Sequence, residues 1–205
     1  TVNTAGERFY QYITAIQAVI SWDQELSGLV KVASDPNTRI ISFTVTEAGY
    51  YLDAHNHLDE NFADLRSDLA GQTCSTIYGA LGKVTLLNCD NLRSNGERFL
   101  SGLKQFLAKH DDQTLLAWVS AHTTAPNSMV DRITPRPTPD IRERVKAATG
   151  RDDPAALMGE TFIQWVVEDH FANGRPAWET VGVEMVKDVM PYEEAKIRLL
   201  NATHS

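Results

Sequence analysis

Hydrophobic residues along this chain follow two spacings, one typical of strands and one typical of helices. Residues 39–46 and 83–90 are short runs rich in β-branched and aliphatic side chains, which predict two strands. The near-continuous apolar character of the first run predicts a buried strand in a parallel sheet. Apolar residues recur three or four positions apart in 7–20, 97–110 and 191–205, and this spacing predicts three amphipathic helices.

Polar and glycine residues follow both predicted strands directly. Glu47 and Gly49 come after the first strand, and Asn91 comes after the second. In an open α/β sheet, ligands bind beyond the carboxyl ends of the strands, so these residues are candidates for a ligand site. Three structural roles are the alternatives: a charge at a helix N-terminus for Glu47, a tight turn at Gly49, and a turn cap at Asn91.

The last predicted helix carries a candidate catalytic group. It has a proline at its first position, 191, and acidic residues in its first turn. On a helix that advances about 100° per residue, Lys196 lies at about 0°, His204 at about 80° and Asn201 at about 140°. A potential base, an imidazole and an amide donor therefore share one sector, which suits removal of a proton from an alcohol. A lysine can accept that proton only if burial or nearby cations disfavour its charged form, and the alternative is a solvated helix face.

Composition and charge exclude several classes of function. The 205 residues have a net charge of −8 and a pI of about 5.2, which argues against a nucleic-acid partner. No apolar run approaches the ~18 residues of a membrane span, and no secretory segment begins the chain, so we expect a cytoplasmic protein. We also expect a monomer or weak oligomer.

No metal site is predicted. His55 and His57 form an H-x-H pair with carboxylates nearby, but no third ligand follows at motif spacing, so the pair is interpreted as part of a solvated loop. Cys74 and Cys89 have neither metal-ligand spacing nor a disulfide framework around them, and both are expected to be reduced and half-buried.

Four segments of the chain resemble motifs of the polyol-specific long-chain dehydrogenases, the mannitol dehydrogenase family. They are Ser-Phe-Thr-Val-Thr-Glu-Ala-Gly-Tyr at 42–50, Cys-Asp-Asn-Leu-Arg-Ser-Asn-Gly at 89–96, Pro-Asn-Ser-Met-Val-Asp-Arg-Ile-Thr-Pro at 126–135, and the closing Lys-x4-Asn-x2-His of Lys196, Asn201 and His204. A fifth segment, 160–169, departs from the family pattern at Thr161, where proline is usual.

The resemblance implies a fold and a domain organisation. Residues 1–188 are expected to form the remainder of a Rossmann-like α/β cofactor-binding domain without its first Gly-rich strand, turn and helix, because no G-x-G-x-x-G occurs in the sequence. Residues 189–205 are expected to form the first helix of an α-helical C-terminal domain. The chain is therefore interpreted as a fragment of a longer enzyme.

The resemblance also implies the chemistry. A secondary alcohol of an open-chain polyol is oxidised to a ketose with NAD, NADP not being excluded, and without a metal. Lys196 is the general base, Asn91 and Asn201 hydrogen-bond the reacting oxygen, and His204 orients the substrate. The other implied roles are hydroxyl recognition by Asp131 and Asn127, and cofactor contacts by Glu47, Gly49 and Asn91. Glu193 is expected to relay the proton, with an exposed glutamate in the first helical turn as the alternative.

Several alternatives stay open. The Asn-Ala-Thr-His-Ser end of the chain is more similar to the family members that convert D-arabinitol to D-xylulose than to those acting on mannitol, fructuronate or tagaturonate. Asp131 could instead form a salt bridge with Arg132. A different class of function, a non-catalytic nucleotide-binding module, would have no need of a buried base. The expected partner is a small polyol or ketose, with no nucleic acid and no membrane.

Overall fold

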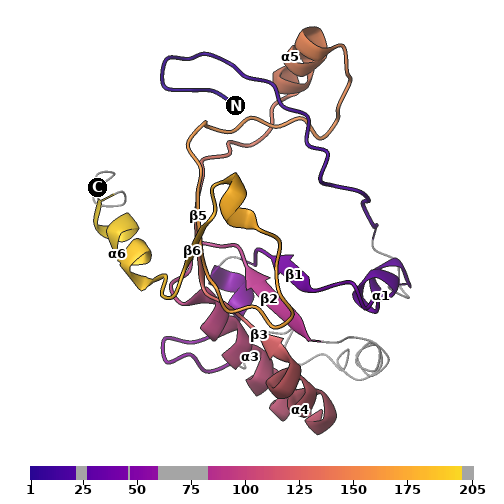
Figure 1. Cartoon of the computed structure of the whole chain (residues 1–205), viewed down its shortest axis with the longest axis vertical. Coiled ribbons are helices and arrows are strands. Elements are labelled where there is room, and N and C mark those ends of the chain that lie inside the picture. Colours follow the sequence, from indigo (N-terminus) through magenta and orange to yellow (C-terminus); the bar gives the residue numbers. More distant parts are fainter. Residues whose placement is uncertain (22–26, 46, 60–82, 200–205) are drawn as a thin grey trace. The chain divides into compact units, whose positions relative to one another are not determined.

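The computed structural model describes four ranges of the chain: 1–21, 27–45, 47–59 and 83–199. The chain folds as two compact units, residues 1–19 with 130–164 and residues 20–129 with 165–205. Figure 1 labels most of the helices and strands of both units.

A three-stranded parallel sheet forms the centre of the second unit. Its strands are β1 (Ile40–Phe43), β2 (Val84–Asn88) and β3 (Thr123–Thr124), in the order β1-β2-β3. Ile40 pairs with Thr85, and Val84 pairs with Thr123, both in parallel register. The two predicted strands and the parallel pairing are confirmed. β2 lies between its neighbours and is buried. The prediction that β1 is buried is wrong, because β1 pairs on one side only among the described strands and stays partly exposed.

Helices α3 (Asn95–Lys109) and α4 (Gln113–His122) pack against each other and against this sheet (Figure 1). Leu107, Leu115 and Val119 form their shared core, with each side chain at most 5% exposed. Asp112 caps α4 by accepting a hydrogen bond from the backbone N–H of Leu115 at 3.0 Å. The helix predicted at 97–110 is therefore α3.

A second three-stranded sheet has the order β4 (Ser128–Asp131), β5 (Gln164–Glu168) and β6 (Glu184–Val186). β5 and β6 run parallel, and α6 (Met190–Leu199) follows β6. Met129, Val166 and Val189 form a small core that joins β4, β5 and the start of α6. The remaining elements are α1 (Ser27–Ala33), η1 (Glu47–Tyr50), α5 (Pro139–Thr149) and η4 (Trp178–Val181).

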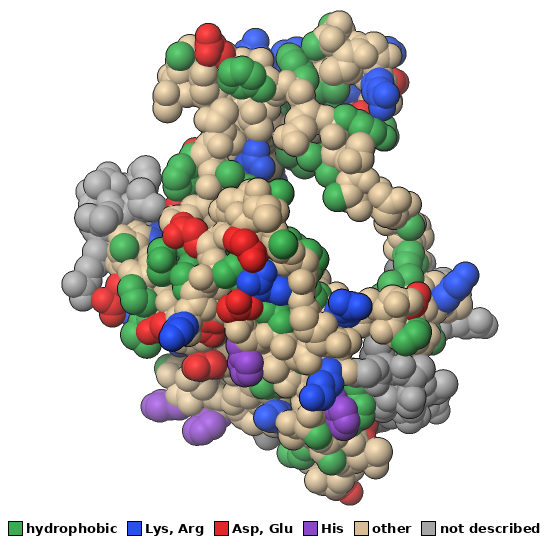
Figure 2. Space-filling model, in the orientation of Figure 1, with side chains coloured by type: hydrophobic (Ala, Val, Ile, Leu, Met, Phe, Trp, Pro, Cys, Tyr) green, Lys and Arg blue, Asp and Glu red, His purple; other side chains and the backbone are tan. Residues whose placement is uncertain are grey.

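The helix predicted at 7–20 is wrong. The first residues fold back on themselves instead: the N–H of Phe9 donates to the carbonyl of Thr1 at 2.8 Å, and the N–H of Asn3 donates to the carbonyl of Glu7 at 3.1 Å. The apolar stripe that predicted a helix is exposed, with Ile16 at 69%. A short helix is stable in water only when its apolar face is packed, and no described element covers this one. Exposed hydrophobic side chains are visible in Figure 2, where acidic and basic ones are intermingled around them.

The turn after β2 and the start of β4 are joined by a fully buried asparagine. The side-chain amide of Asn95 donates to the carbonyls of Asp90 at 3.0 Å and Ser128 at 2.8 Å. Its oxygen accepts from the N–H groups of Ser128 at 2.9 Å and Gly96 at 2.8 Å. The Ser128 hydroxyl completes the junction by donating to the carbonyl of Asn88. The side chain of Asn95 therefore connects two of the sequence motifs, 89–96 and 126–135.

This junction leaves no room for a side chain at position 96. A β-carbon added to Gly96 would lie 2.5 Å from the carbonyl oxygen of Pro126 and closer still to that of Ala125. Both obstacles are backbone atoms, so they cannot swing away. Glycine is therefore required here by the approach of two backbones.

We expect Gly96→Ala to lower the free energy of unfolding by about 3 kcal/mol, the upper range for overpacking a well-filled site. Gly102→Ala, in the same helix, is the matched control, since its β-carbon would lie 3.4 Å from a flexible Leu52 side chain. The control should change stability by less than about 1 kcal/mol, because alanine also favours the helix. Urea denaturation followed by tryptophan fluorescence compares the two, and equal effects would contradict the packing account.

Candidate active site

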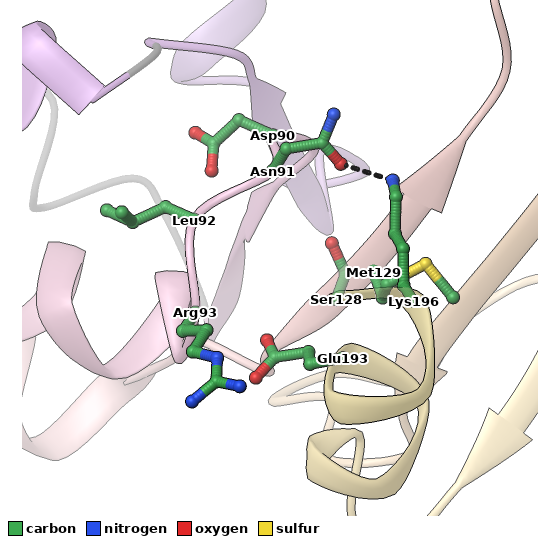
Figure 3. A pocket seen from close by; sticks show the side chains of 8 residues that line it. All are labelled: Asp90, Asn91, Leu92, Arg93, Ser128, Met129, Glu193 and Lys196. Atoms are coloured by element: carbon green, nitrogen blue, oxygen red, sulfur yellow. Dashed lines mark hydrogen bonds between the residues drawn. The ribbon is translucent and has the colours of Figure 1, made fainter. Parts of the chain in front are cut away.

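A lysine and an asparagine that are 105 residues apart in sequence meet at the carboxyl end of β2. Asn91 belongs to the turn that follows this strand, and Lys196 lies on α6. The Nζ of Lys196 donates a hydrogen bond to the Oδ1 of Asn91 at 2.8 Å (Figure 3). The Lys196 side chain is half-buried, and Asn91 is exposed. The structure therefore brings together two residues that the sequence motifs place far apart.

The partner of Asn91 fixes which way its amide points. The lysine nitrogen carries N–H donors, and it donates one of them to the amide oxygen. The NH2 group of Asn91 is then directed away from the lysine, as Figure 3 shows. An outward-facing NH2 group beside an amine can donate a hydrogen bond to an oxygen whose proton the amine removes.

These two side chains line a small cavity of about 140 Å³. The other lining residues, drawn in Figure 3, are Asp90, Leu92, Arg93, Ser128, Met129 and Glu193. Complete ligand pockets usually measure about 300–1,000 Å³, so a bound ligand would extend beyond these residues.

Glu193 supplies a buried carboxyl group one turn before Lys196. It is only 8% exposed, and it accepts a hydrogen bond from the backbone N–H of Ser94 at 3.1 Å. Burial raises the pKa of this carboxyl above its ordinary value of 4.5, and the nearby carboxylates of Glu168 and Asp188 add to the rise. The Ser94 N–H and the Arg93 guanidinium act in the opposite direction without reversing it. Such a carboxyl group can hold a proton more readily than an exposed one.

A buried polar cluster fixes the turn that carries Asn91. The Tyr50 hydroxyl bonds to both carboxylate oxygens of Asp90, at 2.8 and 2.9 Å, and accepts a hydrogen bond from the amide of Asn88. All three side chains are at most 7% exposed. Burial, together with the Asp90 carboxylate, raises the pKa of Tyr50, so the phenol stays protonated and keeps donating. Burial also raises the pKa of the neighbouring Cys89 thiol, to about 11.

The other predicted site residues lie in different surroundings. Asn127 is buried, and its side chain is used within the fold: its oxygen accepts from the Glu97 N–H at 3.1 Å, and its NH2 donates to Glu168 at 3.2 Å. Asp131 ends β4 and belongs to the first unit. Polyol contacts by Asn127 and Asp131 stay predictions. Asn201 and His204 lie outside the described residues.

The predicted cofactor contacts lie after β1. Glu47 begins η1, and Gly49 lies in the same element and borders a separate apolar cavity that also includes Phe99 and Leu103 of α3. The roles of Glu47 and Gly49 beside a cofactor stay predictions. Sequence reasoning missed Arg93, which lines the cavity of Lys196, and the buried Asn95. For Asn95, the sequence feature that could have indicated its role is the Asn-Gly pair at the start of a predicted helix.

Metal ligands do not gather in the described part of the chain. Among those residues, no group of three or more His, Cys, Asp or Glu side chains is placed to hold a metal ion. His55 and His57 are exposed, each with its Nδ1 3.9 Å from a carboxylate oxygen of Asp53. Across the described ranges, no helix combines the length and the apolar character needed to cross a membrane.

Comparison with known proteins gives consistent results. A family model of the mannitol dehydrogenase Rossmann domain matches residues 2–180. Over its whole length the chain is 56% identical to the D-arabinitol 4-dehydrogenase of Ralstonia nicotianae and 52% identical to that of Klebsiella pneumoniae, covering 46% and 48% of those proteins. The chain thus spans about half the length of the curated relatives it matches.

A solved structure supports the same assignment. The ternary complex of Pseudomonas fluorescens mannitol 2-dehydrogenase with NAD and D-mannitol matches with a TM-score of 0.74 and 38% identity. The match covers 87% of this chain and 39% of that one. The predicted Rossmann-type α/β fold with a parallel sheet is thereby confirmed.

We expect Glu193→Gln to stabilise the protein at neutral pH. A carboxyl group with a raised pKa in the folded state favours folding while it is protonated, and this contribution is lost as pH rises through the folded pKa. Glutamine keeps an acceptor for Ser94 and carries no charge. The variant and the wild type should therefore melt together near pH ~4, and the variant should melt higher at pH ~8.

Thermal melts across that pH range test this expectation. Glu143→Gln, which replaces an exposed glutamate of α5, is the control and should show no such trend. A wild type more stable than Glu193→Gln at neutral pH would contradict the electrostatic account of this residue.

Proposed function

Because the chain belongs to the mannitol dehydrogenase family, we propose that it carries part of the active site of an NAD-dependent polyol dehydrogenase. The reaction is the reversible oxidation of a secondary alcohol of an open-chain polyol to a ketose. The hydrogen bond between Lys196 and Asn91 carries this proposal, because it sets a potential base beside an outward-facing amide donor at the carboxyl end of a parallel strand.

D-Arabinitol is the proposed substrate, with D-xylulose as the product. Two D-arabinitol 4-dehydrogenases share more than half of their aligned residues with this chain, whereas mannitol 2-dehydrogenase from Cereibacter sphaeroides shares 38%. Oxidation of mannitol and reduction of fructuronate or tagaturonate are the alternatives within the family.

The proposed chemical step divides between two side chains. The neutral amine of Lys196 takes the proton from the substrate hydroxyl. The NH2 group of Asn91 donates a hydrogen bond to the oxygen as negative charge develops on it. A preorganised donor of this kind is worth about 2–4 kcal/mol in the transition state. Asn201 is proposed as a second donor, and His204 as the group that orients the substrate.

Glu193 is proposed to pass the proton from Lys196 towards solvent. Its burial, its place one turn before the lysine and its raised pKa all support a carboxyl group that can accept a proton and release it. Its place in the cavity of Lys196 adds a geometric observation in support of this role.

NAD, when bound, supplies the acceptor for the hydride that leaves the carbinol carbon. Glu47, Gly49 and Asn91 are proposed to contact this cofactor, because they follow the carboxyl ends of two parallel strands and Asn91 is exposed there. NADP stays an alternative.

The test uses the full-length protein, D-arabinitol, mannitol, sorbitol and hexonates, with NADH absorbance as the readout. We expect turnover of D-arabinitol, and we expect Lys196→Ala to lower kcat by about 10²–10⁴-fold while NAD binding is kept. Lys187→Ala, an exposed lysine between β6 and α6, is the matched control and should retain activity.

Three outcomes would count against the proposal. NAD binding without turnover of any polyol or hexonate would leave a non-catalytic nucleotide-binding module. Turnover of mannitol but not D-arabinitol would reject the proposed substrate within the same family. Full activity in Lys196→Ala would place the base elsewhere.

A further inference from the structure

Glu168 ends β5, and its carboxylate connects two other elements. One oxygen accepts a hydrogen bond from the backbone N–H of Asn127 at 3.0 Å. The other accepts from the Asn127 side-chain amide at 3.2 Å and from the backbone N–H of Val189 at 3.4 Å. Asn127 directly precedes β4, and Val189 directly precedes α6. One carboxylate therefore links the entrance of β4 to the start of the helix that carries Lys196.

The link continues to the turn that carries Asn91. The side-chain oxygen of Asn127 accepts a hydrogen bond from the N–H of Glu97, in the first turn of α3. The same turn of α3 contains Asn95, whose amide binds the carbonyl of Asp90. Hydrogen bonds, together with the first turn of α3, thus connect the residue before Asn91 to the residue before α6.

The start of α6 determines where Lys196 lies. Val189 is 1% exposed and packs with Met129 and Val166, so its backbone is held on both sides. Lys196 follows about two helical turns later, and its bond to Asn91 is 2.8 Å long. A displacement of α6 by about 1 Å would break this bond, because a side-chain separation of ~3.6 Å or more is no longer a hydrogen bond.

We propose that Glu168 is a positioning residue for the reaction, which sets the start of α6 and so places Lys196 opposite Asn91. This inference rests on the proposed function. Glu168 does not line the cavity of Lys196, and it acts through Asn127 and Val189.

The negative charge of Glu168 has a second effect, on the ionisation of Glu193. The charged and titratable groups around Glu193 are Glu168 at the end of β5, Asp188 before α6, Arg93 on the turn after β2 and Lys196 on α6. Glu168 and Asp188 both raise the pKa of Glu193. Removal of the Glu168 charge should therefore lower the pH at which Glu193 ionises.

The test compares Glu168→Gln with Glu143→Gln in the full-length enzyme. Glutamine has one acceptor oxygen where the carboxylate has two, so at least one of the N–H groups of Asn127 or Val189 would face an NH2 group. We expect kcat to fall about 10–100-fold with the KM for the polyol changed less than about threefold. We also expect the acid limb of the kcat–pH profile to move to lower pH. The Glu143→Gln control should match the wild type in kcat and in the position of the acid limb.

Glu168→Asp separates position from charge. It keeps the carboxylate but shortens the side chain, so kcat should fall while the acid limb stays near its wild-type position. It also replaces Glu168→Gln if that variant does not fold. A kcat within twofold of the wild type in a folded Glu168→Gln or Glu168→Asp variant would overturn the inference.

A readout independent of activity distinguishes failure of the inference from failure of the proposed function. If the wild type turns over no polyol, the proposed function fails, and the position of Lys196 is then measured by reductive methylation with mass spectrometry. We expect Lys196 to be methylated at least threefold faster in Glu168→Gln, because its bond to Asn91 is lost. Lys187 in the same digest should not change. Equal rates for Lys196 in both proteins would overturn the positioning role.

Discussion

The buried amide of Asn95 is the interaction on which the site depends. It joins the turn after β2 to the start of β4 by bonding to the backbone of Asp90 on one side and of Ser128, 33 residues from Asn95, on the other. Every polar atom of this side chain has a partner, and an unpaired group in such a place would cost about 1–3 kcal/mol. The close backbone contact at Gly96 follows from the same junction. The turn that carries Asn91 is rigid because its neighbours cannot move independently.

Two buried carboxyl groups near this junction, those of Asp90 and Glu193, have different environments. Asp90 is buried beneath the turn and bonded to a protonated Tyr50, whereas Glu193 is buried beside Lys196 and accepts a backbone hydrogen bond. The first arrangement holds a carboxylate in place, and the second leaves a carboxyl group whose pKa is raised. Asp90 supports the turn, and the proton relay proposed for Glu193 depends on the second environment.

The sequence predicted the elements that local patterns control. β2 was predicted from an apolar run, and α3 from apolar residues at helical spacing. The helix predicted at 7–20 does not form, because a short helix is stable only when its apolar face packs against a partner. The start of this segment instead forms hydrogen bonds with the first residues of the chain. The meeting of Lys196 with Asn91 and the links through Glu168 span 21–105 residues, and no local spacing records such contacts. The motifs that carry the family resemblance nevertheless contain these residues.

The central claim is that Lys196 and Asn91 act as one unit on the substrate oxygen. A double-mutant cycle on kcat for polyol oxidation tests it most directly, with Lys196→Ala, Asn91→Ala and the double variant of the full-length enzyme. Residues that act as a unit are strongly non-additive, so we expect the double variant to be no more than a few-fold slower than Lys196→Ala alone. Losses that multiply across the two substitutions would contradict the account, because the two side chains would then act independently.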